Sequence, residues 1–270
     1  MGITPKNWEK FFYDESEGLG TLYERIILHK LFERIIKEYK INNVLECPSF
    51  GMTGFSGINS WFFAKHGLDV CVADDDSKRL YFIRKVWRLA NLNAKFVKVI
   101  DYEKLPFEND QFDLVWNFSS LWYLRGCDLG NVLNELVRVC RKVLLIINPN
   151  KNLFYILRKF IDKNFFIFVN ESLVDSIRLL FERDDIELVE NGYIDTPPWI
   201  DIPLKLRDVF RSQNRKKIVL PEYYQYLSNP ELERKILRLS FLEFSPNFFK
   251  KRWSHHVYYI FQKSPFKGLK

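Results

Sequence analysis

The chain has 270 residues, of which 47% are hydrophobic and 28% are charged. This composition excludes wholesale disorder, and the length suits one large domain with an appended subdomain rather than two independent domains. The formal net charge is +7, and residues 200–252 alone carry 12 basic against six acidic residues. The basic excess is therefore concentrated late in the chain.

Cysteine usage and the first residues predict the compartment of the protein. The four cysteines contain no Cys-x-x-Cys pair, and most of them lie among apolar neighbours: Cys47, Cys71, Cys127 and Cys140. This pattern predicts reduced thiols and no metal site. The start of the chain has no apolar run of the length that a signal peptide or a membrane span requires. We therefore expect a cytoplasmic protein.

The expected elements begin with a helix within residues 8–40, where apolar residues recur at intervals of three and four. An apolar run at 43–46 ends in an acid, and a glycine-containing loop then leads into an apolar helix that ends near Gly67. Next come, in chain order, strand 69–73, helix 80–89, strands 96–100 and 112–116, helix 131–140 and strand 142–147. This alternation predicts an α/β fold, with a Rossmann-like, doubly wound, mostly parallel sheet and helices on both faces.

The later part of the chain is less regular. Residues 151–182 predict helix, 186–194 and 256–261 predict strands, and 197–252 form a basic, aromatic-rich insertion. We therefore divide the sequence into three parts, which are an N-terminal helical arm or lid at 1–40, a core at 41–196 with 253–263, and the insertion 197–252 as a substrate cap.

Three acids are expected where successive parallel strands end, namely Glu46, Asp74 and Asp101. In such sheets, ligands bind at the carboxyl ends of the strands, near the switch in strand order. A cationic ligand with a ribose and an adenine explains three carboxylates better than a pyrophosphate does. Acids also cap helices that follow strands, so a structural role stays open.

The stretch Asp101–Trp116 contains an acid, then Leu-Pro-Phe, then Phe-Asp-Leu-Val. Across residues 40–150 the chain resembles class I, Rossmann-like S-adenosylmethionine-dependent methyltransferases of the ubiquinone and menaquinone biosynthesis type. The resemblance implies S-adenosylmethionine as co-substrate. It implies that Asp101 lies by the adenine, Tyr102 beside the adenine ring, and Asp74 on the ribose, with Asp75 next to it. It also implies a segment under the methionine moiety, formed by Asn117, Phe118 and Ser119.

The glycine loop departs from that family. It runs from Glu46 to Gly57, is longer than usual, and has Pro48 where a glycine is normal. We expect Glu46 to act through water on the amino-acid part of the cofactor. The candidate loop contacts are Pro48, Gly51, Gly54 and Gly57, because glycines allow backbone to approach a ligand closely.

Methyl transfer from a sulfonium requires alignment of the nucleophile and the methyl group in a shielded site, and it requires a general base only for some acceptors. The sequence therefore predicts no obligatory catalytic residue. Candidates are Tyr23 in the arm, Tyr123 after the fourth strand, and His255 and His256 at the last strand. Each also has a structural interpretation, because none belongs to a recognisable dyad. The segment Gly18–Arg25 is a candidate lid over the site with its glycines as hinges, and the start of a helix is the alternative.

Three functions remain open. Methylation of a small-molecule or lipid-linked acceptor is favoured by the resemblance and by the aromatic insertion. The basic residues there favour an anionic substrate or a peripheral membrane contact, although a solvated basic face explains them equally well. Protein or RNA methylation is allowed by the basic segment, although no RNA-binding module is recognisable. A non-catalytic, NAD-type nucleotide-binding protein is allowed by the irregular glycine loop.

Overall fold

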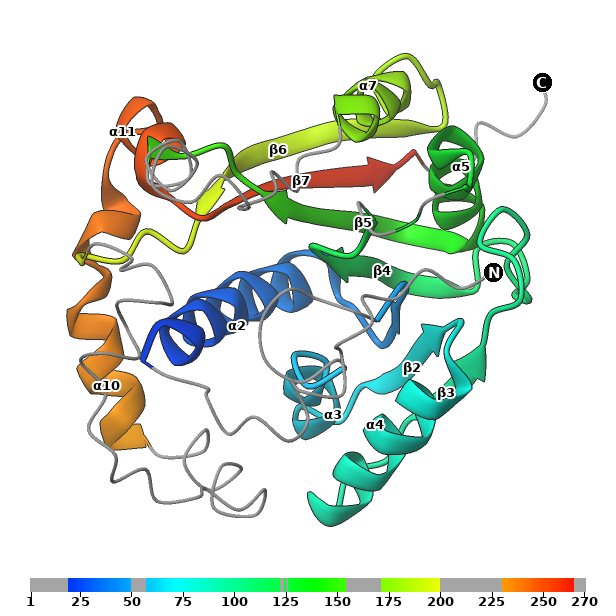
Figure 1. Ribbon diagram of the computed structural model, residues 1–270, viewed down its shortest axis with the longest axis horizontal. Coiled ribbons are helices and arrows are strands. Elements are labelled where there is room, and N and C mark those ends of the chain that lie inside the picture. Colours follow the sequence, from blue (N-terminus) through cyan, green and yellow to red (C-terminus); the bar gives the residue numbers. More distant parts are fainter. Residues whose placement is uncertain are drawn as a thin grey trace.

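The structure is a computed structural model that describes residues 19–49, 57–121, 124, 126–153, 171–199 and 230–264 (Figure 1). Three of the residues expected in the site, Gly51, Gly54 and Tyr123, lie outside the described residues. The first part of the helix expected at 8–40, much of 151–182 and residues 200–229 of the insertion also lie outside them.

Seven strands form one sheet in the order β3-β2-β1-β4-β5-β7-β6. The strands are β1 Asn43–Glu46, β2 Asp69–Asp74, β3 Lys95–Lys98, β4 Phe112–Phe118, β5 Cys140–Pro149, β6 Ile186–Ile194 and β7 His256–Lys263. The first five pair in parallel, whereas β7 is antiparallel to both β5 and β6. The prediction of a Rossmann-like, mostly parallel sheet is confirmed.

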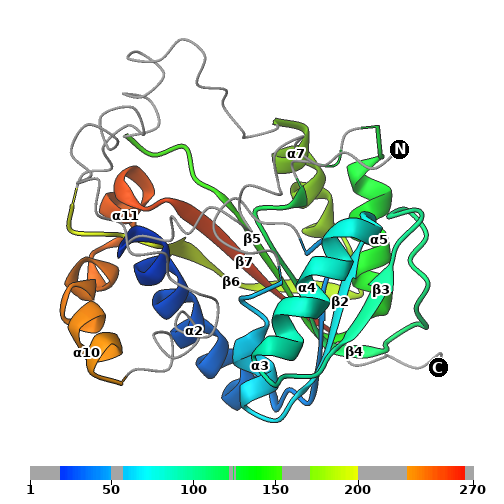
Figure 2. The same ribbon diagram turned by 60° about the horizontal axis from the view of Figure 1, so that its bottom comes forward.

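Helices cover both faces of this sheet (Figures 1 and 2). They are α2 Leu19–Tyr39, α3 Trp61–Lys65, α4 Ser77–Leu89, α5 Leu129–Val139, α7 Glu171–Leu180, α10 Pro230–Arg238 and α11 Asn247–Trp253, with the 3₁₀ helix η2 Ser240–Phe244. One core cluster joins α2, α3 and α4 to the sheet, and a second joins α5 and α7 to it. Leu144 and Leu145 of β5 belong to different clusters, because successive strand residues point to opposite faces. No helix within the described ranges is long and apolar enough to cross a bilayer.

The observed bounds of the core elements lie close to the predicted ones. β4 and β5 extend beyond prediction because they pair along their length, from Phe112 with Cys140 to Phe118 with Ile147. α5 begins two residues earlier than predicted, at Leu129, because the Asp128 carboxylate accepts the first free N–H groups of the helix. β3 ends at Lys98, which places Asp101 in the following loop rather than at the strand end.

The expected N-terminal arm contributes to the core. α2 begins at Leu19, and its residues Leu22, Leu28, Phe32 and Ile35 are buried in the first cluster. The sequence Gly18–Arg25 therefore includes the start of this helix. Its role as a lid stays a prediction.

The late insertion begins after β6 and ends before β7, which are neighbouring strands. Their register pairs Ile194 with His256, so the two ends of the insertion lie together at the sheet edge where β4 and β5 end. α10 lies alongside α2 in both views, and Lys30 Nζ is 3.1 Å from a Glu233 carboxylate oxygen (Figures 1 and 2). The insertion is thus anchored beside the first helix.

Gly57 ends the glycine loop in a conformation that favours glycine, with a φ of +71°. A Cβ atom there would lie 2.9 Å from Ile83 Cγ2 of α4. The Gly57 carbonyl accepts a hydrogen bond of 3.2 Å from Trp87 Nε1. The end of the loop is therefore fixed against α4.

Candidate cofactor and acceptor site

The carboxyl ends of the first three strands bring together the predicted acids. Glu46 ends β1 and Asp74 ends β2, and both are buried. Asp101 follows β3 in an exposed loop, where its Oδ1 accepts a hydrogen bond of 2.8 Å from Glu103 N. The three carboxylates thus lie at one edge of the sheet but differ sharply in environment.

Asp74 is fully buried and is already saturated with hydrogen bonds. Its Oδ2 accepts from Arg79 Nε at 2.9 Å and from the Ser49 hydroxyl, and its Oδ1 accepts from Arg79 Nη2 and from Asp76 N. A carboxylate offers about four acceptor positions. Asp74 therefore acts as the buried partner of Arg79, a residue that sequence analysis missed although it lies on the first turn of the next helix.

Of the neighbouring acids Asp74 and Asp75, Asp75 is the one that can still accept hydrogen bonds on its solvent-facing side. Its side chain is 15% exposed, and its Oδ1 lies 3.1 Å from Arg79 Nη2. Tyr102 is buried, and its hydroxyl donates to Asp75 Oδ1 at 3.3 Å and accepts from Asp75 N at 3.0 Å. Burial and the neighbouring Asp74 charge raise the pKa of Asp75. Two of the predicted cofactor-binding residues, Tyr102 and Asp75, therefore lie in contact, and their contact with a cofactor stays a prediction.

Glu46 is held in an apolar setting beneath the loop. The Ser60 hydroxyl donates to Glu46 Oε2, and Trp116 Nε1 donates to the same hydroxyl oxygen at 3.2 Å. Burial raises the pKa of Glu46 to about 8, and the Asp74 charge adds to this rise while the hydrogen bond from Ser60 opposes it. Glu46 is thus mainly protonated at neutral pH.

The end of β4 carries buried polar atoms that have no partner among the described residues. Within that part of the chain, both side-chain polar atoms of Asn117 and the Ser119 hydroxyl make no hydrogen bond, and neither residue is exposed. Asn148 Oδ1, at the end of the adjacent strand β5, is also unpartnered. Buried polar groups are nearly always satisfied, so these atoms indicate a ligand with its own donors and acceptors. They fit an amino acid such as the methionine part of S-adenosylmethionine.

The described residues at the start of the glycine loop lie beside the end of β4. Pro48 is buried, and its carbonyl accepts a hydrogen bond of 3.0 Å from the Ser120 hydroxyl. Cys47 N donates to Trp116 O at 3.0 Å, which ties the start of the loop to β4. Pro48 therefore lies next to the Asn117–Ser119 segment, as the predicted loop contacts require.

A carboxylate and two imidazoles meet where β6 ends and β7 begins. Asp195 Oδ2 lies 2.7 Å from His255 Nδ1 and 3.5 Å from His256 Nδ1, and Asp195 is buried. Burial by itself would raise the pKa of Asp195, but the charges of the two histidines and their hydrogen bonding lower it to about 2. Asp195 has a φ of +63°, a sparsely populated conformation for a residue other than glycine. Asp195 stays ionised at neutral pH.

His256 connects this cluster to the β4 end. Its ring centroid lies 4.6 Å from that of Phe118, between the two unpartnered residues of β4. His256 is buried, and its Nδ1 lies 3.5 Å from Asp195 Oδ2, so any hydrogen bond between them is weak, and Nδ1 has no other partner among the described residues. His256, a predicted catalytic candidate, is therefore in ring contact with Phe118, a predicted cofactor residue.

Tyr23 of α2 closes the other side of the cluster. Its hydroxyl lies 2.9 Å from Glu243 Oε1 and 3.0 Å from the Thr196 carbonyl oxygen, and burial raises its pKa. Glu243 also accepts from Thr196 N and Thr196 Oγ1. Sequence analysis missed Asp195 and Glu243, although an acid directly after a predicted strand was the available signal for Asp195.

Three residues of this region are of the types that hold metals. One ligand atom each from Glu24, Asp195 and His256 lies within 4.8 Å of the others, and all three are buried. Zinc ligands lie about 2 Å from the ion. Ligand atoms this close to one another can share one ion, so the three side chains are a candidate metal-binding group.

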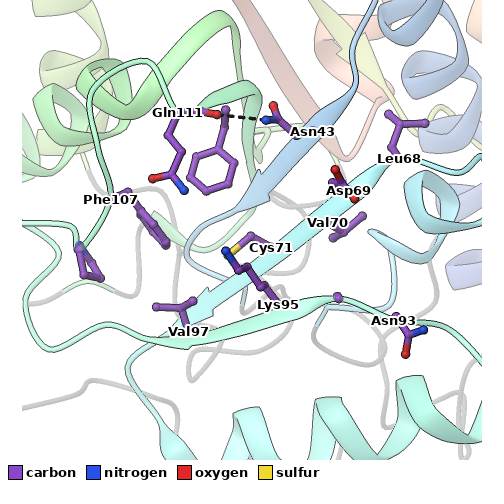
Figure 3. Close-up of a pocket in the computed structure, with 13 residues that line it drawn as sticks. Asn43, Leu68, Asp69, Val70, Cys71, Asn93, Lys95, Val97, Phe107 and Gln111 are labelled. Atoms are coloured by element: carbon purple, nitrogen blue, oxygen red, sulfur yellow. Dashed lines mark hydrogen bonds between the residues drawn. The ribbon is translucent and has the colours of Figure 1, made fainter.

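A cavity of about 660 Å³ lies at the opposite edge of the sheet (Figure 3). It is lined by residues at the strand starts, including Asn43, Asp69 and Lys95. Its wall is completed by Phe107, in the loop between β3 and β4, and by Phe112 at the start of β4. Ligands of parallel α/β sheets bind at the carboxyl ends, so this cavity is separate from the predicted site.

Residues 54–143 match a family model described as a methyltransferase domain. The matched segment is therefore similar to methyltransferase domains. This match agrees with S-adenosylmethionine as the co-substrate that the sequence predicts. A search of curated proteins found no match, and the ubiquinone and menaquinone subtype stays a prediction.

Solved structures are similar to this chain in fold. The structure of MccD protein has a TM-score of 0.53 at 18% identity, and the alignment covers 86% of this chain and 96% of that one. A SAM-dependent methyltransferase from Aquifex aeolicus has a TM-score of 0.50 at 15% identity, covering 71% and 94%. The plantazolicin methyltransferase BpumL, in complex with SAH, has a TM-score of 0.52 at 12% identity, covering 96% and 93%.

The buried pair of Asp74 and Arg79 predicts an asymmetric effect on stability. Replacing Arg79→Met leaves a buried carboxylate without its cation, and we expect the free energy of unfolding to fall by about 3–5 kcal/mol. The double variant Asp74→Asn with Arg79→Met should lose less than the sum of the single variants. Denaturant unfolding measures this, with Arg178→Met, from the exposed pair with Asp175, as the control. Equal loss in Arg79→Met and the control would contradict the buried pair.

The raised pKa of Glu46 predicts a pH-dependent stability. The carboxyl group of Glu46 binds its proton more tightly in the folded protein than in the unfolded chain. Its contribution to the free energy of unfolding is therefore complete below the ordinary pKa of 4.5 and is lost as pH rises through about 8. Between these two pH values, the free energy of unfolding should fall with pH less steeply in Glu46→Gln than in wild type, by about 1 kcal/mol per pH unit. Urea unfolding across this pH range tests it, with the exposed Glu187→Gln as the control. Parallel curves for Glu46→Gln and wild type would disprove it.

Proposed function

We propose that this methyltransferase transfers the methyl group of S-adenosylmethionine to a small-molecule or lipid-linked acceptor that carries a removable proton. The observation that supports the cofactor position is the set of unpartnered buried atoms of Asn117 and Ser119 at the end of β4. The observation that supports the acceptor position is His256, which packs on Phe118 between them.

The adenosine part is assigned to the ends of β2 and β3. Asp75 would accept the ribose hydroxyls, because the acceptor positions of Asp74 are filled by Arg79, Ser49 and Asp76. Tyr102 and Asp101 would flank the adenine, as the family resemblance implies. This assignment moves the expected ribose contact by one residue, from Asp74 to Asp75.

The methionine part is assigned to the edge formed by β1 and β4. Asn117 offers both a donor and an acceptor, and Ser119 offers a hydroxyl, which together match an ammonium and a carboxylate. Glu46 lies behind the loop with a raised pKa, and the positive charges of the co-substrate favour its ionised form. When bound there, the co-substrate supplies an electrophilic methyl group.

The proton of the acceptor is assigned to His256. Its Nδ1 is buried and unpartnered, so it can accept a proton from a hydroxyl or amine as that atom forms its bond to the methyl carbon. The carbon–sulfur bond breaks in the same displacement, and its electron pair stays on sulfur. Asp195, which lies beside His256 and is ionised, stabilises the resulting imidazolium and acts as a positioning residue.

The unpartnered atoms predict opposite effects on stability and on binding. Ser119→Ala and Asn117→Leu remove buried polar groups that have no partner, so the free protein should be as stable as wild type or more stable. Each variant should nevertheless weaken binding of S-adenosylhomocysteine by about 1–3 kcal/mol in titration calorimetry.

Ser120→Ala is the matched control for this experiment. It removes a hydroxyl that is hydrogen-bonded to Pro48 O, so it should lower stability. Unchanged affinity for S-adenosylhomocysteine in both Asn117→Leu and Ser119→Ala would overturn the assigned cofactor position. Tight binding of NAD with no affinity for S-adenosylhomocysteine would overturn the proposed function itself.

The proton-accepting role predicts a defect confined to turnover. With an acceptor found by screening small molecules and lipids for transfer of a labelled methyl group, His256→Gln should lower kcat about 100-fold or more. Its affinity for S-adenosylhomocysteine should stay at the wild-type value, because the defect is confined to the transfer step. A wild-type kcat in His256→Gln would refute this role.

A further inference from the structure

An exposed surface, here named the Phe/Lys surface, consists of Phe241, Phe244, Phe248, Lys251 and Arg252. The three phenylalanine side chains are 60%, 87% and 69% exposed, respectively, and both cations are exposed. Single exposed apolar residues are ordinary, but three large aromatic side chains within eight positions are a concentrated apolar surface.

The local helices direct these side chains together. Phe241 and Phe244 are three residues apart in η2, where such residues eclipse one another because a 3₁₀ helix has three residues per turn. Phe248, Lys251 and Arg252 have the three-and-four spacing that defines one face of α11. Arg252 Nη1 donates to Phe248 O at 3.0 Å, and this hydrogen bond holds the guanidinium group close to Phe248.

The opposite face of α11 holds the helix to the protein. Trp253 Nε1 donates to Pro197 O at 2.7 Å, and Phe249 stacks on Trp253 with ring centroids 5.7 Å apart. Lys250 Nζ donates to Tyr193 O at 3.0 Å, which fixes the helix to β6. The exposure of Phe248 is therefore a property of an anchored helix.

The charge on this surface has one sign. Glu243 is the one acid between Ser240 and Trp253, and its carboxylate oxygens bond to Tyr23 and Thr196. The nearest exposed residue at the end of α10 is another cation, Arg238. An anionic partner is thus complementary to the Phe/Lys surface.

We propose that the Phe/Lys surface docks the protein on an anionic lipid bilayer. Aromatic rings enter the boundary between headgroups and acyl chains, while lysine and arginine side chains contact the lipid phosphates. A nucleic-acid site requires more cations, since tight binding neutralises about six or more phosphates. Among the described elements, α11 lies toward the left edge in both views (Figures 1 and 2).

The position of Glu243 relates this surface to the acceptor site. It lies in η2 between Phe241 and Phe244, and it bonds to Tyr23 and Thr196, which adjoin Asp195. A bilayer on the Phe/Lys surface would therefore lie beside the proposed acceptor position. This last step rests on the proposed function and favours a membrane-borne acceptor, whereas the docking itself does not depend on it.

Vesicle sedimentation of the full chain tests the docking. Vesicles of phosphatidylcholine with about one-third phosphatidylglycerol should bind the protein at least about fivefold more tightly than phosphatidylcholine alone, and salt should weaken this binding. The triple variant Phe241→Ser, Phe244→Ser, Phe248→Ser should lose about tenfold or more in affinity. The double variant Lys251→Glu, Arg252→Glu should lose the preference for anionic lipid.

Matched controls lie on α4, which is distant from α11 in both views (Figures 1 and 2). The variant Lys85→Glu with Arg88→Glu makes the same change in charge, and Tyr81→Ser with Leu89→Ser removes exposed apolar area there. Both should bind vesicles like wild type. Each variant is checked by thermal unfolding, because exposed substitutions should leave stability within about 0.5 kcal/mol.

Several outcomes would overturn the docking. Wild-type protein that stays in the supernatant with anionic vesicles contradicts it, and so do Phe/Lys variants that sediment like the α4 controls. Self-association that depends on the three phenylalanines, without vesicle binding, would reassign the surface to a second copy of the chain. Single-stranded RNA binding through the same residues, again without vesicle binding, would reassign it to nucleic acid. Wild-type affinity for S-adenosylhomocysteine in the Phe/Lys variants shows that such a failure leaves the proposed function intact.

Discussion

The parallel pairing of β1 with β2 on one side and β4 on the other is the constraint on which the site depends. It aligns Glu46 with Trp116 of β4 and Val72 of β2, so the ends of three strands share one edge of the sheet. The strand order changes direction between β1 and β4, because β2 and β3 lie on one side of β1 and β4 and β5 on the other. The loops that follow these strands diverge at this point, as in other sheets of this kind. Polar residues that are far apart in sequence consequently meet at a single edge.

Satisfied and unsatisfied polar groups separate the structural residues of this edge from the functional ones. Asp74 and Arg79 are both buried, and their mutual hydrogen bonds offset the cost of removing two charges from water. Asn117 and Ser119 are equally buried, but no described residue is their hydrogen-bond partner. The ends of β2 and β4 both carry buried polar residues, but those of β2 bond to each other and those of β4 are available to a ligand. Burial alone does not distinguish these two roles.

The antiparallel strand β7 extends the same edge beyond the cofactor residues. Because β7 pairs with β5 on one side and β6 on the other, His256 lies opposite both Pro149 and Ile194. This register brings Asp195 to the two histidines and brings His256 to Phe118. The long insertion then returns through η2, where Glu243 joins Tyr23 of α2 to Thr196. The region beside the cofactor thus depends on contacts that span most of the chain.

The sequence by itself determined the mostly parallel sheet and predicted the acids near its strand ends, because apolar periodicity and the Asp101–Trp116 stretch are local signals. Only the tertiary structure decided which of those acids is free. The pairing of Arg79 with Asp74 depends on the angle at which α4 follows β2. Asp195 lies near His256 because of the register between β6 and β7, although about 60 residues of chain, 195–255, separate them in sequence. A one-dimensional pattern records spacing, whereas hydrogen bonding depends on distances and angles between elements.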